Sequence, residues 1–518
     1  MKVLYIPSDE RPCNYKYPLY LANLTDDVCI LAPPMEYMGK VKQPCDVDKL
    51  WEWVFNNIKD CSYAVMSVDT MVYGNLINSR IHKKTPEQCE NYLNNFIKLK
   101  EINPHIKIHA YNLVTRVAAG NSNAEDPDYW SEYGSSIWKY GYISDKLNNN
   151  QASEHEKLEI EDLSEIIPHE YMDDFLERRK TNHFVNTRCI ELTRDNIFDY
   201  LVIPKDDCAE FGFASMEQKQ LSKIIYEYRV MDHVMVYPGA DEVGSVLFTR
   251  VFNRYKNYTP KVFVRYSSTL GGTVVPLYED RPLNESIKYQ IISIGGIMVT
   301  SASESDLLLA VHSPGKHMIE SAEQYYKDIS FTTYTNINEF IRYILYYSDT
   351  YKKPYAIADV AFSNGSDNEF MVFARQSGVF DRVCAYAGWN TSQNSIGVSL
   401  AHGVLCSYYN SFKDNEEKLL LSTEFMMRNI ISDWFLMSNV IHMFSAMQND
   451  YPEVDYYHVG ENGEFVRNTM KDMIVNLINK EFKGVYKGRR IEFDILTLPW
   501  NRIFEIDFNL KLAEAEKE

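Results

Sequence analysis

Two carboxylates and a guanidinium follow the first apolar segment of the chain. Residues 3–7 read VLYIP, and Ser8, Asp9, Glu10 and Arg11 come directly after them. Two acids in different environments can divide into a proton donor and a base, and an arginine can hold a carboxylate through paired hydrogen bonds. The structural alternative is that Asp9 caps a helix and forms an ion pair with Arg11.

The same residue types recur after the other apolar segments. The candidate acid–base residues are Asp69, Asp206, Asp207, Asp241 and Glu242. The candidate substrate-binding residues are Asp9, Glu10, Arg11, Arg80, Arg116, His312, Trp389, Asn390 and Asn394. Repetition at so many strand ends favours a lined pocket over isolated helix caps. Trp389 offers a flat face to a sugar ring, with packing in the core as its alternative.

Motifs for cofactors and for other kinds of catalysis are absent. The sequence has no HExxH, no Cys/His metal spacing, no Walker or GxGxxG phosphate loop, and no GxSxG nucleophile. We therefore predict no metal ligands and no cofactor, although the aspartates leave an oxygen-rich divalent-metal site open.

Short apolar runs at regular intervals indicate the elements that position these residues. The predicted strands are 3–7, 28–34, 63–69, 106–112, 200–206 and 233–239, then 261–267, 306–312, 354–362 and 382–388. Helical spacing separates them, as in 46–59, 86–100 and 281–296. Continuous apolar strands that alternate with helices are typical of buried parallel sheets.

Ten strands exceed one eight-stranded barrel, so the pattern predicts an α/β fold of two doubly wound parallel-sheet lobes, with an irregular β/α barrel as the alternative. We assign 1–255 to the first lobe, with a helical insertion at 120–200 that could cover a cleft as a lid. Residues 256–410 form the second lobe. Residues 411–518 form a C-terminal helical segment that ends in a strand.

Composition limits the partners and the location. The formal charge is -19, which opposes binding to nucleic acid or to anionic membranes. No apolar stretch reaches the length of a membrane span. The nine cysteines form no CxxC pair, which is typical of a reduced protein in the cytoplasm. The expected partner is a small-molecule substrate, and the oligomeric state is not predicted.

Four stretches together resemble one bacterial family. They are YIPSDERPCNY, SVDTMVYGNLINSR, AYAGWNTSQNSIG and LPWNRIFEIDF, and they extend from Leu4 to Phe508. This combination is similar to the domain of unknown function 4127 (DUF4127). Where relatives read PLDERP, this chain has Ser8 before Asp9. The resemblance implies a bacterial, mostly cytosolic protein and assigns no activity.

The density of acids at strand ends leads us to expect a hydrolase with an Asp/Glu acid–base pair, acting on a small carbohydrate-like substrate. One alternative is a non-catalytic protein that binds a small metabolite between two lobes. The other is a metal-dependent lyase or phosphohydrolase.

Overall fold

The computed structural model describes residues 1–412, 415–446 and 454–514. These residues form two compact units, which are described separately. The first unit holds Met1–Ala22, Asp27–Phe248 and Tyr278–Arg281, and the second holds Asn23–Asp26, Thr249–Leu277 and Pro282–Glu518.

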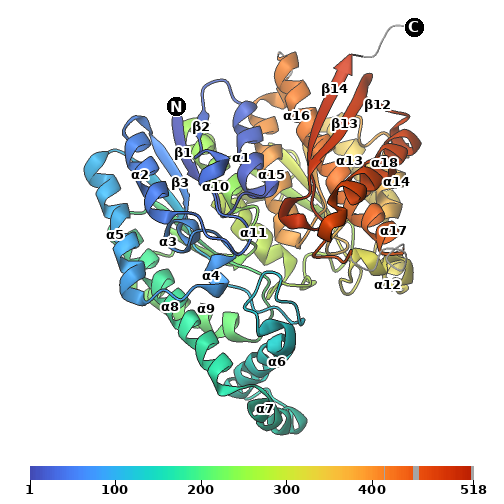
Figure 1. The fold of residues 1–518 in the computed structure, drawn as a ribbon. Coiled ribbons are helices and arrows are strands. Elements are labelled where there is room, and N and C mark those ends of the chain that lie inside the picture. Colours follow the sequence, from blue (N-terminus) through green and yellow to red (C-terminus); the bar gives the residue numbers. More distant parts are fainter. Residues whose placement is uncertain (413–414, 447–453, 515–518) are drawn as a thin grey trace. The chain divides into compact units, whose positions relative to one another are not determined.

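Six parallel strands form the sheet of the first unit (Figure 1). They are β1(Lys2–Ile6), β2(Cys29–Leu31), β3(Tyr63–Ser67), β4(Lys107–Tyr111), β5(Tyr200–Lys205) and β6(Val234–Pro238). Their order is β2-β1-β3-β4-β5-β6. Every residue of β5 and β6 is buried, because helices cover both faces of a parallel sheet. All six strands predicted for this part of the sequence are confirmed.

Helices connect these strands. They are α1(Pro12–Asn23), α2(Val47–Asn57), α3(Val68–Tyr73), α4(Asn78–Ile81), α5(Pro86–Ile102), α9(Phe213–Tyr228) and α10(Val243–Tyr255). Local sequence signals set their starts. Thr85 and Gln88 form a capping box at α5, for example, with Pro86 at the first helical position.

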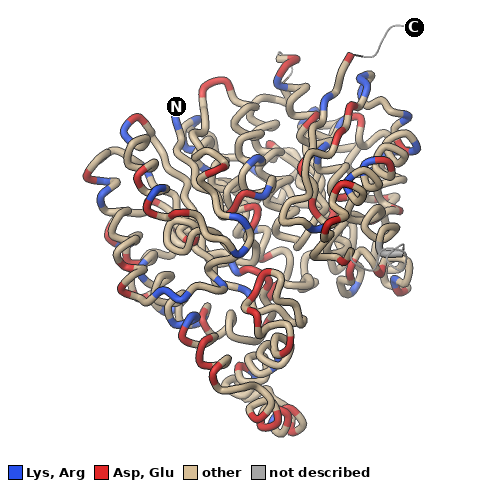
Figure 2. Tube along the Cα trace, viewed as in Figure 1, with Lys and Arg blue, Asp and Glu red and all other residues tan. Residues whose placement is uncertain are grey.

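Between β4 and β5 the chain forms the three helices α6(Trp130–Asn148), α7(Glu154–Ile166) and α8(His169–Arg194). The Asn-rich turn at 148–150 is exposed. Acidic residues are dense along α7, which Figure 2 shows in red. The buried side of α8 includes Arg178, Arg179 and Asn182, so this long helix brings polar groups into the interior of the unit.

Five parallel strands form the main sheet of the second unit, in the order β11-β10-β9-β7-β8. They are β7(Lys261–Tyr266), β8(Ile297–Val299), β9(Leu307–His312), β10(Tyr355–Asp359) and β11(Ala385–Ala387). The sequence predicted four of them. It missed β8 because that strand is three residues long and directly follows Gly295 and Gly296. In both sheets the first strand lies between the second and third, which is a doubly wound order.

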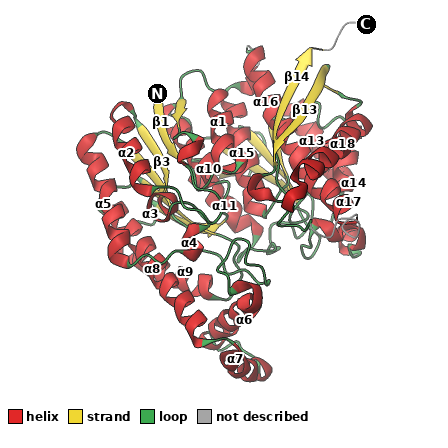
Figure 3. Cartoon of the chain, in the orientation of Figure 1, coloured by secondary structure: helices red, strands yellow, loops and turns green. Residues whose placement is uncertain are grey.

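The helices around this sheet are α11(Leu283–Ser293), α12(Ser330–Thr333), α13(Ile337–Tyr351), α14(Asn368–Gln376) and α15(Ser392–Tyr408). The C-terminal segment adds α16(Glu416–Asn429), the π-helix η5(Ile430–Val440), α17(Ile441–Ala446) and α18(Gly463–Phe482). It ends in the antiparallel strands β12(Val485–Tyr486), β13(Arg489–Thr497) and β14(Asp507–Glu514), drawn in yellow in Figure 3.

The predicted α/β class, with two parallel sheets and a C-terminal helical segment, is confirmed. Neither parallel sheet closes into a barrel within the described residues. Among the helices described, none is long and apolar enough to cross a membrane.

Candidate active site at the carboxyl ends of the first sheet

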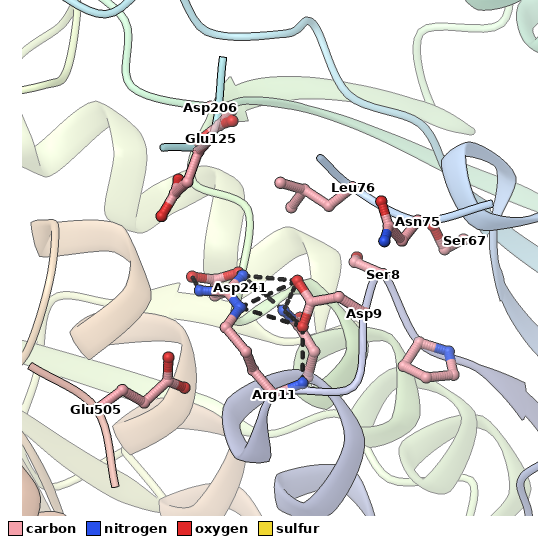
Figure 4. A network of polar contacts seen from close by, with 12 residues as sticks. Ser8, Asp9, Arg11, Ser67, Asn75, Leu76, Glu125, Asp206, Asp241 and Glu505 are labelled. Atoms are coloured by element: carbon pink, nitrogen blue, oxygen red, sulfur yellow. Dashed lines mark hydrogen bonds and ion pairs between the residues drawn. The ribbon is translucent and has the colours of Figure 1, made fainter. Parts of the chain in front are cut away.

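A buried ion-pair network joins the residues that follow β1 to those that follow β6 (Figure 4). The Arg11 guanidinium donates to Asp9 at 2.7 Å and to Asp241 at 2.5 Å. The Asn14 amide donates to the same two carboxylates. At most 7% of any of these residues is exposed. Arg11 and Asn14 therefore hold the two acids in one cluster.

This contact joins two strand ends that are not neighbours in the sheet. Three strands separate β1 from β6, and four spacings of about 4.8 Å would put their ends about 19 Å apart in a flat sheet. Arg11 nevertheless touches Asp241. The segments that follow β1 and β6 must therefore extend toward each other along this edge, which gathers the polar residues of the two strand ends.

The β1 and β3 ends are tied together at the point where the strand order reverses. Ser67 caps α3 by accepting the Thr70 N–H, and the Thr70 hydroxyl donates to the Pro7 carbonyl at 2.7 Å. The Leu76 N–H donates to the Ser8 carbonyl at 2.8 Å. Gly74, with φ 105°, allows this return because a Cβ there would lie 2.5 Å from Pro44.

Asp69, at the start of α3, is a buried carboxyl without a cationic partner among the hydrogen bonds and ion pairs described. It is 1% exposed and accepts the Leu113 N–H at 2.9 Å. Burial raises its pKa to about 8. The group is therefore protonated near neutral pH in the folded protein, but ionised in the unfolded chain.

This raised pKa makes stability depend on pH. Stability that Asp69 contributes in acid is lost as pH rises from the unfolded value, 3.8, through the folded value of about 8. Asp69→Asn keeps an acceptor for Leu113 and cannot ionise. We expect the melting temperature of the variant, relative to the parent, to rise between pH 5 and 8 by a few °C. Asp195→Asn, at an exposed position, should leave the pH dependence of the melting temperature unaltered. If the melting temperatures of Asp69→Asn and the parent changed in parallel with pH, the raised pKa of Asp69 would be contradicted.

A second network joins the β3, β4 and β5 ends. Arg80 donates to Glu125 at 3.0 Å and to Asp206 at 2.5 Å. Arg116 donates to Asp126 at 2.7 Å, lies 3.2 Å from Glu125, and reaches Asp207 at 3.4 Å. Figure 4 shows Glu125 and Asp206 together. Two arginines thus hold four carboxylates in defined positions.

Asp207 differs from its neighbours in conformation and exposure. Its φ of 29° lies in the left-handed region, which non-glycine residues adopt mainly at turns and functional sites. Its side chain is 32% exposed, against 11% for Asp206. Burial of the carboxylate and the charge of Asp206 raise the pKa of Asp207 to about 6. Asp207 is therefore an accessible acid that exchanges protons near neutral pH.

A pocket lies between these strand ends and the helical insertion. Its lining residues are Arg80, Thr115, Arg116, Asp126, Pro127, Trp130, Phe175, Arg178, Arg179 and Asn182. The space is about 280 Å³, including its open mouth. The enclosed room within it is about that of one water molecule, so a larger ligand would require the wall to open.

Several residues of the second ion-pair network and of the pocket were missed from the sequence. Glu125 and Asp126 lie in the long loop after β4, far beyond the strand end. Arg178 and Arg179 lie on α8, where the sequence looks like an ordinary charged helix. Arg179 pairs with Glu217 at 2.6 Å and donates to the Thr115 carbonyl at 3.1 Å. The available signal was the acid pair Glu125–Asp126 just before a helix start.

Two further predicted site residues, Glu242 and Glu10, lie in different surroundings. Glu242 is fully buried and accepts the Ala240 N–H at 3.0 Å, so it folds back on its own turn. Glu10 is partly exposed beside the Arg11 network. Both remain predictions as site residues.

The other predicted residues belong to the second unit. His312 bonds to the Ser267 hydroxyl at 2.9 Å and to Asp367 at 3.0 Å. All three residues are more than nine-tenths buried, so this series ties β7, β9 and α14 together. Trp389 and Asn390 are half-buried after β11, and Asn394 is buried in α15. Participation of these residues in one site with the first unit stays a prediction.

The described residues contain no group of three or more His, Cys, Asp or Glu side chains arranged to hold a metal ion. The site is thus best described by its ion pairs and its pocket.

Comparison with known proteins gives a family without an assigned activity. No curated protein matches the chain. The family model described as a protein of unknown function, DUF4127, matches residues 3–509. The match covers nearly the whole sequence, and the chain therefore belongs to the DUF4127 family.

Proposed function

We propose that the protein is a cytoplasmic bacterial hydrolase that acts on a small polar, carbohydrate-like molecule through an acid–base pair. The observation that carries the proposal is the placement of Asp207 and Asp126 on neighbouring nitrogens of the Arg116 guanidinium, beside the pocket. Their environments differ, as acid–base catalysis by two carboxyl groups requires.

Asp207 is the proton donor in this proposal. Its raised pKa, about 6, leaves it partly protonated near neutral pH, and its exposure lets it reach a leaving-group oxygen. Asp126 lies on the pocket wall and is held in an ion pair with Arg116, so it is the carboxylate that activates water or attacks the substrate.

The wall of the pocket supports a hydroxyl-rich substrate. Guanidinium groups and the Asn182 amide donate hydrogen bonds, whereas Asp126 accepts them, and a sugar hydroxyl can do both. The nine cysteines are all free, which supports a reducing compartment such as the cytoplasm.

The test is hydrolysis of a panel of nitrophenyl glycosides and glycuronides by the full chain, with and without a chelator. We expect release of nitrophenol from at least one substrate, insensitive to the chelator and abolished in Asp126→Asn. Asp195→Asn, an exposed acid at the end of α8, is the control. Binding without turnover would favour the metabolite-binding alternative, and loss of activity with the chelator would favour the metal-dependent one.

A further inference from the structure

A serine, a histidine and an aspartate form one hydrogen-bonded series in the second unit. The Ser267 hydroxyl lies 2.9 Å from Nδ1 of His312, and Nε2 of the same ring lies 3.0 Å from the Asp367 carboxylate. A nucleophile that is activated by a base, with the base oriented by a carboxylate, uses these residue types in this order of contact. No GxSxG motif surrounds Ser267, but such a series is recognised by its geometry and not by its sequence.

The series lies where the strand order of the second sheet reverses. Ser267 directly follows β7, and His312 is the last residue of β9. Since β7 lies between β8 and β9, the chain leaves β7 on one side to form β8 and returns on the other side to form β9. The carboxyl ends of the strands at such a point are where open α/β sheets bind their ligands.

The hydrogen bonds fix which atom carries each proton. The second oxygen of Asp367 accepts the Glu369 N–H at 2.9 Å. Burial opposes ionisation of Asp367, but its hydrogen bond with His312 lowers the pKa below the usual value. The ionised carboxylate can only accept, so Nε2 of His312 carries the proton and Nδ1 is an acceptor. The Ser267 hydroxyl donates to this nitrogen, and the Ser313 carbonyl, at 3.4 Å, is its more distant alternative.

Donors for a developing negative charge lie beside the serine. The Ser313 N–H donates to the Ser267 oxygen at 3.0 Å. The Ser313 hydroxyl is buried and has no hydrogen-bond partner among the described residues. Gly271 lets the loop after β7 lie against this hydroxyl, because a Cβ at that position would clash with its oxygen. Buried donors that are already in place stabilise the oxyanion of an acyl-transfer reaction.

We propose that Ser267 is the nucleophile of a second hydrolytic site, which cleaves esters of small carboxylic acids with His312 as the base. Asp367 is the positioning residue that orients the imidazole. Ser267 is the most exposed of the three, at 7%, so the ester approaches from its side and only a small acyl group fits. The site belongs to the second unit and does not depend on the acid–base pair proposed for the first.

The reaction needs no further reactant besides water. The Ser267 oxygen attacks the carbonyl carbon, and its proton passes to Nδ1 of His312. The ester C–O bond then breaks, His312 gives the proton to the leaving alcohol, and the acyl group remains on Ser267. Water attacks this acyl group while His312 takes a proton from it. The proton returns to the Ser267 oxygen as the carboxylic acid leaves.

The test is to label the full chain with diisopropyl fluorophosphate and to locate the label by mass spectrometry of its peptides. We expect a single phosphoryl group on Ser267, with release of fluoride. His312→Gln keeps a polar side chain but has no base, so its labelling should be slower by roughly a hundredfold or more. Hydrolysis of nitrophenyl acetate should fall to a similar extent in Ser267→Ala. Circular dichroism checks that both variants fold.

Ser268→Ala is the matched control. Ser268 is the next residue and is equally buried, but its hydroxyl bonds to the Gly315 carbonyl and to the Leu270 N–H instead of His312. This variant should be labelled and should hydrolyse nitrophenyl acetate as the parent does. No label on Ser267, labelling of His312→Gln at the parent's rate, unchanged ester hydrolysis in Ser267→Ala, or an equal loss in Ser268→Ala would each overturn the proposal.

Discussion

Asp207→Asn should lower the rate of hydrolysis by roughly a hundredfold to ten-thousandfold, the usual contribution of a positioned general acid. The amide cannot donate the proton that the leaving group needs. Asparagine tolerates the left-handed backbone at this position, so the fold should be kept. The measurement is kcat/KM for an alkyl glycoside of the sugar that the nitrophenyl panel identifies, together with circular dichroism of the variant.

The pH dependence of kcat/KM tests independently whether Asp207 is the proton donor. A general acid must be protonated, so kcat/KM of the parent should fall as pH rises through about 6, the raised pKa of Asp207. Burial and the negative charge of Asp206 are the causes of this raised pKa. The residual activity of Asp207→Asn should not show this fall with rising pH. If kcat/KM of the variant fell with rising pH as that of the parent does, another group would be the proton donor.

Substrates with activated leaving groups add a control. A nitrophenolate leaves without protonation, so Asp207→Asn should harm nitrophenyl substrates less than alkyl glycosides of the same sugar. Asp195→Asn should harm neither, because Asp195 is exposed and paired with Arg194. Equal losses on both substrate types would indicate a structural effect of the substitution at Asp207.

The sequence was sufficient for most of the architecture, because buried parallel strands are continuous apolar runs. Tyr200–Lys205 is fully buried, and its run was easy to recognise. Strands of three residues give a weaker signal, so Ile297–Val299 was missed. The antiparallel strand Arg489–Thr497 was missed for another reason. Its charged, partly exposed residues form no apolar run.

The site was predictable only in part. Strand ends identified Arg80, Arg116, Asp206 and Asp207, since a parallel sheet collects such ends at one edge. No local sequence pattern could show that Arg116 pairs with Asp126, because this ion pair depends on how a long loop returns to the sheet. The pairing of Arg11 with Asp241 likewise depends on the paths of two segments that are far apart in the sequence.

Removal of the Arg11 guanidinium should strongly destabilise the first unit. In Arg11→Met, Asp9 and Asp241 would remain buried beside each other and would both lose the guanidinium that pairs with them. Breaking a buried ion pair in this way costs about 3–5 kcal/mol. The measurement is the urea unfolding of the variant and the parent, followed by a probe of the first unit.

The physical cause of the lost stability in Arg11→Met can be tested separately from its size. Two buried acids without a cation take up protons more readily, so the deficit of Arg11→Met should shrink as pH falls from 7 toward 4. The triple variant Asp9→Asn, Arg11→Met, Asp241→Asn removes all three charged groups of this cluster and should recover most of the stability. Arg188→Met, at a partly exposed pair, should lose about 1 kcal/mol or less. If the triple variant were no more stable than Arg11→Met, lost packing of the arginine would explain the effect, and the Asp9–Arg11–Asp241 cluster would not be held by its charges.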